Sequence, residues 1–300
     1  MNWADASAGW SWNPVTDLQQ IWAFPFMVNA FRAGSVVAVL AAAMGWFMVL
    51  RRQSFAGHTL AVVSFPGAAC ATLLGISASF GYFAFCVGGA LVIAVIPRSG
   101  QGGGQESALT GTVQAFLLAC GFLFVALYKG FLGGVNSLLF GSFLGITTLQ
   151  VTVVTIVAAL ALVVLAVIGR PLLFASVDEN VATGRGVPVR VLSVAFLVLL
   201  GTATAEASQI TGTLLVFALL VMPAAAAQQL TARPTTSLAL SLLIALAVTW
   251  TGLIAAYYSP YPIGFYVTTF AFAVYVLART GRTLAAAVRR HRLVGPGALA

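Results

Sequence analysis

Two ionisable side chains inside long apolar segments are the residues of this chain best suited to do chemistry. Glu206 lies in the segment GTATAEASQITG at 201–212, beside several hydroxyl-bearing residues, and His58 lies near the start of another apolar segment. An ionisable group is costly in a bilayer, so its presence there indicates a function by default. Carboxylate and hydroxyl oxygens attract cations, and imidazole binds transition metals well. The sequence therefore predicts two candidate cation contacts on a transport path.

Each of these residues also has a simpler interpretation. Glu206 falls where two apolar segments join closely, so it also fits a short outer loop with a solvated acid. His58 also fits an interfacial histidine that faces lipid headgroups. Both alternatives remain open at the level of the sequence.

The patterns typical of enzymes are absent from the sequence. It contains no GxxxxGK[ST] phosphate-binding loop, and the glycines at 102–104 do not follow a predicted strand. The apolar segments hold no paired carboxylates and no Ser/His arrangement. Cys70, Cys86 and Cys120 lack CxxC spacing and are expected to be small buried side chains without a disulfide or metal. We therefore expect no catalytic residues and no tightly bound cofactor.

The elements that position Glu206 and His58 are predicted to be membrane helices. The chain is 61% hydrophobic and 7% charged, with a mean hydropathy of +1.03 over 300 residues. A membrane-spanning helix needs about 20 residues. The apolar segments predict nine spans, at about 26–50, 56–77, 80–97, 110–128, 149–169, 190–207, 209–229, 235–257 and 262–280. The fold class is therefore an all-α, polytopic membrane bundle.

The cations predict how this bundle is oriented. With the N-terminus outside, 12 of the 14 Lys and Arg residues fall on the cytoplasmic side, as the positive-inside rule requires. The exceptions are Arg32 and Lys129. The predicted domains are an outer-face interfacial segment rich in tryptophan (1–25), one transmembrane domain (26–280) and a basic cytoplasmic tail (281–300). The glycine-rich segment 129–148 is expected at the outer face or partly re-entrant, which requires burial in protein.

A polar segment, RPLLFASVDENVATGRGVPVR at 170–190, interrupts the apolar pattern on the predicted cytoplasmic side. Ser176 and Glu179 have the spacing of a capping box, which predicts a short helix at about 177–184. Gly184 and Gly186 supply stop signals, and Pro188 prevents the helix from continuing. Ala182 and Gly186 give one small flank that lets another protein approach. The alternative is a solvated loop with a well-capped turn.

Four segments, in order, resemble the permease subunits of zinc- and manganese-type ABC importers. FAGHTLAVVSFPGA at 55–68 is similar to the early helix of that family, and VNSLLFGSFLGIT at 135–147 resembles its "LFG-LLG" segment. The polar segment at 170–190 looks like the coupling loop of the family, and TGTLLVFALLVMPAAAAQQL at 211–230 resembles its late helix. The resemblance extends from about residue 24 to 280.

This resemblance implies a metal-type ABC importer permease fold, with a homodimer in the bacterial cell membrane. It assigns the coupling helix to Asp178, Glu179, Ala182 and Gly186, which would contact a cytoplasmic ABC ATPase. An extracytoplasmic binding protein would deliver zinc or manganese as cargo. His58 occupies a position where many relatives carry Asp and some carry His.

The chain departs from the family one helical turn after His58. The family has a second histidine there, whereas this chain has Val62. The resemblance therefore does not fix which metal is carried, nor whether His58 touches it.

Two prolines, Pro66 and Pro223, fall inside predicted spans, and Gly67 follows the first. A proline in a span needs neighbours that satisfy the freed carbonyl, and small residues let helices approach closely. Close packing is the favoured role, with a gating hinge as the alternative.

Two other transporter classes remain possible from the sequence. An ion-gradient-driven secondary transporter or channel would usually need more intramembrane carboxylates than the single Glu206. An ABC permease for a metal chelate, such as a siderophore, would need a wider cavity.

Overall fold

The computed structural model describes residues 19–95, 104–128, 138–139, 141, 145–259 and 261–293, and these form helices joined by turns, with no strand among them. The principal helices are α2 (Pro25–Leu50), α3 (Ser54–Leu73), α4 (Ala78–Val95), α5 (Gly104–Leu127), α7 (Thr148–Val177), α8 (Glu179–Gly184), α9 (Val189–Thr211), α10 (Thr213–Leu230), α11 (Pro234–Tyr257) and α12 (Ile263–Leu293).

Nine of these helices match the nine predicted spans. Within the described part of the chain, eight helices are long and apolar enough to cross a membrane, and the apolar part of α10, Leu215–Leu230, is shorter. The prediction of an all-α polytopic membrane bundle is therefore confirmed, with eight helices of spanning length and one shorter apolar helix at the nine predicted positions.

Local sequence signals account for where several helices begin. Pro25 and Pro234 stand at the starts of α2 and α11, where the missing N–H costs nothing and φ is already helical. A capping box begins α7: the Gln150 amide donates to Thr147 Oγ1 at 3.2 Å, and the Thr147 amide donates to Gln150 Oε1 at 2.9 Å.

Two helices run further than their apolar patterns predict. α7 continues through Arg170 and Pro171 to Val177, so the first eight residues of the polar segment extend a membrane helix. Leu172 on this extension is fully buried, which explains why the helix does not stop at the first charge. α12 likewise continues past residue 280 to Leu293, through much of the predicted basic tail.

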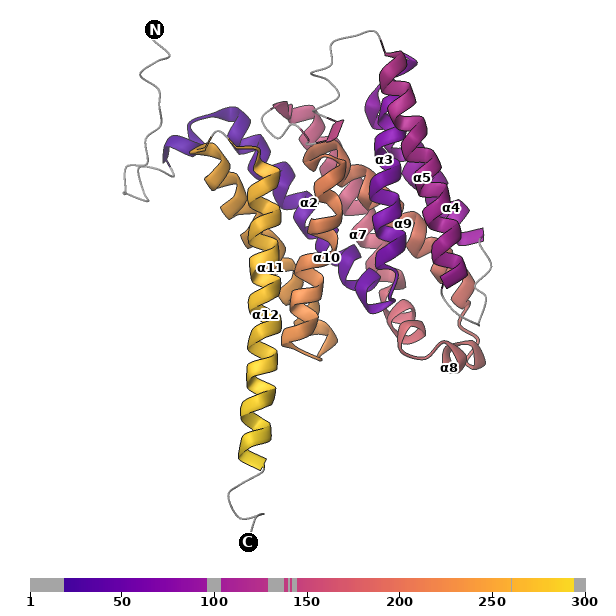
Figure 1. Ribbon diagram of the computed structural model, residues 1–300, viewed down its shortest axis with the longest axis vertical. Coiled ribbons are helices and arrows are strands. Elements are labelled where there is room, and N and C mark those ends of the chain that lie inside the picture. Colours follow the sequence, from indigo (N-terminus) through magenta and orange to yellow (C-terminus); the bar gives the residue numbers. More distant parts are fainter. Residues whose placement is uncertain are drawn as a thin grey trace.

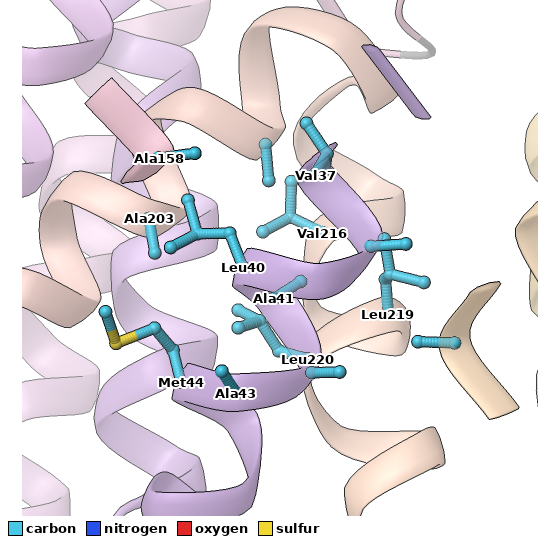
Figure 2. Close-up of a cluster of buried hydrophobic side chains, with 14 of the residues drawn as sticks. Val37, Leu40, Ala41, Ala43, Met44, Ala158, Ala203, Val216, Leu219 and Leu220 are labelled. Carbon is cyan, nitrogen blue, oxygen red and sulfur yellow. The ribbon is translucent and has the colours of Figure 1, made fainter. Parts of the chain in front are cut away.

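The helix α2 lies at the centre of the bundle and packs against α7, α9, α10 and α11. Figure 2 shows its side chains interleaved with those of α10 on one side and of α7 and α9 on the other; the labelled residues are Val37, Leu40, Ala41, Ala43, Met44, Ala158, Ala203, Val216, Leu219 and Leu220. Gly45 faces the backbone of Leu220 so closely that a side chain at this position would collide with it. Helix association in lipid depends on such close packing, because lipid tails are as apolar as the helices.

Hydrogen bonds between side chains and neighbouring helices fix the position of α2. The Trp46 indole donates to Ser237 Oγ on α11 at 2.9 Å, and the Gln228 side-chain amide on α10 donates to the Trp46 carbonyl at 3.0 Å. Near the other end of α2, the Asn29 side-chain amide donates to the carbonyl of Ile146, just before α7, at 3.1 Å. Polar groups that bond across helices hold transmembrane bundles in register.

The helices α3, α4 and α5 form a second group beside this centre (Figure 1). Gly67 of α3 and Gly81 of α4 face each other without room for a Cβ atom on either. The other face of α4 packs on α9, where Gly201 lies against the backbone of Cys86. The second group is thus joined to the centre through α9.

The short helix α8 lies at one end of the bundle, the end toward which α12 extends (Figure 1). The turn between α2 and α3 and the turn between α10 and α11 carry Arg51, Arg52 and Arg233 at this same end. Arg32 lies in the first turns of α2, toward the opposite end. Among the described cations, these three therefore lie at the end of the bundle opposite to Arg32.

Several predictions fall outside the described residues. Most of 129–148, expected to be re-entrant, and residues 1–18 of the expected interfacial segment are among these. Trp22 is described; it is exposed and stacks on Phe31, with 5.8 Å between ring centroids. Cys70, Cys86 and Cys120 are free cysteines; Cys86 is buried as expected, whereas Cys70 and Cys120 are only half-buried.

Candidate functional site

The helix α8 begins at a different cap from the one the sequence predicted. Asp178 is the N-cap: its backbone is extended, and its Oδ1 accepts a hydrogen bond from the Val181 amide at 2.9 Å. The predicted cap, Ser176, is wrong because α7 continues to Val177. Ser176 is therefore helical, and its hydroxyl donates to the Leu172 carbonyl. A serine inside a helix commonly bonds back to the carbonyl four residues earlier.

The predicted stop signals at the end of α8 are confirmed. α8 ends at Gly184, and Gly186 adopts a positive φ of 80°, which glycine accepts without a steric penalty. The Gly186 amide donates to the Thr183 carbonyl at 2.9 Å, and the Val187 amide donates to the Ala182 carbonyl at 3.1 Å. Pro188 follows as the N-cap of α9.

The small flank of α8 faces its own chain. Ala182 is fully buried and clusters with Ala175 at the end of α7 and Val189 at the start of α9. The expectation that Ala182 presents a flank to another protein is therefore wrong: its small size lets α8 seat against the two helices that it connects.

Several other residues of this loop are exposed and available to a partner. Asp178, Glu179 and Gly186 are exposed. Val181 is an exposed apolar side chain among them. The loop thus offers a compact surface with two acids, one valine and a glycine turn.

Arg51, which the sequence marked only as an orientation charge, lies directly behind this loop. Its Nη1 donates to Ser176 Oγ at 3.1 Å and its Nη2 donates to Ser193 Oγ at 2.7 Å. Its guanidinium also lies over the Phe196 ring, 5.6 Å from the centroid. The signal in the sequence was an arginine pair at the end of a span, but the two serine partners are 125 and 142 residues away.

Glu206 is fully buried inside α9. The alternative of a solvated acid in an outer loop is therefore wrong. Glu206 Oε2 accepts a hydrogen bond from the Gln209 side-chain amide at 3.3 Å, and Oε1 is buried without a partner. Buried polar atoms nearly always find a partner, so this oxygen is suited to receive a cation or a water molecule.

Buried hydroxyl groups also occur in α9 and at its contact with α3. Thr204 and Ser208 are fully buried, and the Ser208 hydroxyl donates to Ser64 Oγ at 3.0 Å. Ser64 in turn donates to the carbonyl of Ala61. The sequence predicted this polar cluster within α9, but the contribution of Ser64 from α3 depends on the packing of the two helices.

His58 lies in the second turn of α3, half-buried against α10. Its ring meets Phe217 edge to face at 4.8 Å between centroids, and its Nδ1 is buried without a partner. The ring therefore packs against protein at this position, and an orphaned imidazole nitrogen is available for a ligand.

His58 and Glu206 lie at different levels of the bundle. The contact between Ser64 and Ser208 marks one level of the bundle. At a rise of about 1.5 Å per residue, His58 lies roughly 9 Å from that level and Glu206 roughly 3 Å. Within the described part of the chain, no group of three His, Cys, Asp or Glu residues is placed to hold a metal ion. The two residues are separate contacts along the bundle.

The two prolines lie inside helices, as predicted. Pro66 interrupts α3, and Gly67 after it makes the close contact with α4 described above. Pro223 interrupts α10 next to Ala224, Ala226 and Ala227, which are fully buried. Close packing is the arrangement found at both sites.

The family model for the ABC 3 transport family matches residues 23–281, which is nearly the whole helical bundle. The chain belongs to the ABC 3 transport family. Members of this family are permease subunits of ABC transporters, and the hydrolysis of ATP belongs to a partner subunit. The ATP-driven interpretation is therefore favoured over an ion-gradient-driven transporter.

Relatives within the ABC 3 transport family carry metals. The chain is 30% identical to the manganese import system permease protein ScaB of Streptococcus parasanguinis, over 71% of this chain and 74% of that protein. It is 31% identical to the chelated iron transport system membrane protein YfeC of Yersinia pestis, over 72% of each.

Solved structures share the fold. PsaBC from Streptococcus pneumoniae in complex with Fab matches with a TM-score of 0.78 and 25% identity, over 88% of this chain and 94% of that one. A putative metal-chelate type ABC transporter in an inward-facing conformation matches with a TM-score of 0.69 over 87% of this chain; at 17% identity it shows the fold alone.

Proposed function

We propose that this chain is the membrane permease subunit of an ATP-driven importer for a divalent transition metal, manganese or zinc. The observation that carries the proposal is the combination of family membership with a capped, seated helix α8 that exposes Asp178 and Glu179. Two manganese permeases among the relatives, at 30% and 26% identity, support the choice of cargo.

The proposed partners follow from the same observations. A cytoplasmic ABC ATPase binds the exposed face of α8, and an extracytoplasmic protein delivers the metal at the opposite end. Two copies of the permease form the transport unit. The positions of the cations support an N-terminus outside and a C-terminus in the cytoplasm of a bacterial cell.

The cargo passes weak contacts rather than a tight site. His58 Nδ1 and Glu206 Oε1 are buried acceptors without partners, and Ser208, whose hydroxyl bonds to that of Ser64, lies two positions further along α9 than Glu206. Imidazole nitrogen favours zinc and other transition metals over magnesium and calcium. A path with few ligands lets an ion leave as readily as it enters.

A chelate is the second candidate cargo, because YfeC is described as a chelated iron transport protein. The two candidates differ in what crosses the membrane. Uptake of free manganese or zinc in competition with a chelated form separates them.

The first experiment purifies the chain with its ATPase and reconstitutes the complex in vesicles. We expect copurification and ATP-dependent uptake of manganese or zinc. Charge reversal of Asp178 and Glu179 to Lys is expected to uncouple ATP hydrolysis from uptake while membrane insertion survives. Full uptake in cells that lack every ABC ATPase would refute the proposal.

A second experiment tests the cargo contacts. His58→Ala and Glu206→Gln are each expected to lower metal uptake, because each removes a ligand atom or a charge from the path. Val62→Ala, one helical turn after His58, is the matched control and is expected to leave uptake unchanged. If uptake by both site variants equals that of the control, the assignment of these residues is wrong.

A further inference from the structure

We propose that Arg51 is a positioning residue that transmits the displacement of α8 to the central helix α2. This inference rests on the proposed function, since it concerns how the permease follows its ATPase. It assigns to Arg51 a role beyond its contribution to orientation.

The guanidinium of Arg51 joins three helices at one point. Arg51 is the C-cap of α2, and its two terminal nitrogens donate to Ser176 at the end of α7 and to Ser193 in the second turn of α9. These are the two helices that α8 connects. A planar guanidinium with diverging N–H groups suits such a fork, and a lysine ammonium does not reproduce it.

The residues that bind Arg51 adjoin the residues that seat α8. Ser176 follows Ala175, and Ser193 lies one helical turn after Val189, and both Ala175 and Val189 pack on Ala182. A force applied to the exposed face of α8 therefore reaches the same helix ends that hold the guanidinium. Because α8 is only six residues long, it has little capacity to absorb that force by bending.

The helix α2 is the element that receives this movement. Its backbone continues into Arg51, whose amide bonds to the Phe47 carbonyl at 2.9 Å. The same helix packs against α10. Phe217 of α10 contacts the ring of His58 on α3. A shift of α2 at its α8 end thus reaches the helices next to the candidate metal contacts.

The fork lies beside a hollow at this end of the bundle. A polar hollow of about 560 Å³ lies between the α2–α3 turn and the α7–α9 ends, and its walls include Arg51, Arg52, Ser176 and Glu179. Around the guanidinium, the gap between α2 and the coupling loop is bridged by hydrogen bonds and one aromatic contact. Removal of those hydrogen bonds is expected to weaken the transmission of movement from α8 to α2 while the packed bundle stays folded.

The neighbouring Arg52 provides a matched control. It carries the same charge, lies one residue away and lines the same hollow, but it is exposed. Its backbone has a positive φ of 56°, and this conformation is equally unfavourable for arginine and glutamine. Arg52→Gln therefore matches Arg51→Gln in charge and in backbone cost.

The test compares variants of the permease in complex with its ATPase in vesicles, measuring metal ions transported per ATP hydrolysed. We expect Arg51→Gln to lower this ratio about tenfold, within the range typical of coupling between sites, while the complex still assembles and hydrolyses ATP. Ser176→Ala combined with Ser193→Ala should lower it similarly with the arginine intact. Arg51→Lys should restore it in part, and Arg52→Gln should leave it unchanged.

The outcomes that overturn the inference are distinct from those that overturn the function. If the wild-type complex transports metal and Arg51→Gln has the same ratio as Arg52→Gln, the inference is wrong and the function stands. If Arg51→Gln reduces assembly, ATP hydrolysis and uptake in equal proportion, Arg51 is merely structural. Absence of ATP-dependent uptake by the wild-type complex would refute the proposed function, and the inference with it.

Discussion

Substitutions at Asp178, the N-cap of α8, give the most direct test of the proposed coupling role of this loop. Asp178→Ala removes the oxygen that accepts the Val181 amide at 2.9 Å. Asp178→Asn keeps an acceptor of the same shape and removes the charge. Glu179→Gln changes the other acid, which lies in the first turn of α8 and is not the cap.

The structure sets the size of the expected effect. Loss of an N-cap side chain costs about 1 kcal/mol, within a range of roughly 0.5–2, and 1 kcal/mol is about a fivefold change in an equilibrium constant. A helix of six residues does not form unaided, because helix nucleation is unfavourable. Within α8, Ala182 is the one side chain that is buried. The cap is therefore a large share of what keeps α8 formed.

Two measurements check this expectation. Amide exchange at Val181 should be about fivefold faster in Asp178→Ala, since the free energy that protects this amide falls by about 1 kcal/mol. The apparent affinity of the ATPase subunit should fall by about the same factor, because part of its binding energy must reform the helix. Asp178→Asn should keep most of the protection of the Val181 amide and most of the affinity for the ATPase subunit, since asparagine caps helices about as well as aspartate.

Two results would contradict the reasoning. If Asp178→Asn is as impaired as Asp178→Ala, the charge of Asp178 matters and its cap does not. If Asp178→Ala leaves the amide exchange rate of Val181 unchanged, the packing of Ala182 against Ala175 and Val189 is enough to keep α8 formed.

Three further predictions concern the bundle. Gly67→Ala should lower the melting temperature of the solubilised protein, because the new Cβ meets the backbone of α4 and overpacking costs about 1–3 kcal/mol. Gly88 has open space around it, so the control Gly88→Ala should leave the melting temperature unchanged or raise it slightly. Trp46→Phe removes the bond to Ser237 and should cost about 0.6 kcal/mol in a membrane, seen as a small drop in the same melting temperature. Glu206→Gln should lower metal uptake without a fall in melting temperature, since the new amide oxygen still accepts a hydrogen bond from Gln209. If both metal uptake and the melting temperature fall, Glu206 has a structural role instead.

The sequence predicted the parts of this fold that depend on local composition. Apolar length located the nine spans because each must satisfy its backbone hydrogen bonds within the bilayer. Glycine at 186 and proline at 188 predicted the end of α8 correctly, because their backbone preferences do not depend on distant neighbours. The resemblance to family motifs predicted a coupling role for the segment around Asp178 and Glu179, and this role stays a prediction.

Tertiary packing decided where α7 stops and α8 begins. The capping spacing at Ser176 is genuine in the sequence, but burial of Leu172 extends α7 past Ser176 and transfers the cap to Asp178. A local motif competes with packing, and here packing prevails. The capping box at Thr147, by contrast, is present at the start of α7.

The sequence by itself determined that this is an all-α membrane bundle with a polar segment at one end, because hydropathy and backbone preferences are properties of short stretches. Only the tertiary structure decided which way side chains face. It turned Ala182 inward, buried Glu206 and placed Arg51 against serines more than 120 residues away. Those contacts depend on how helices pack across the whole chain, and no local pattern specifies that packing.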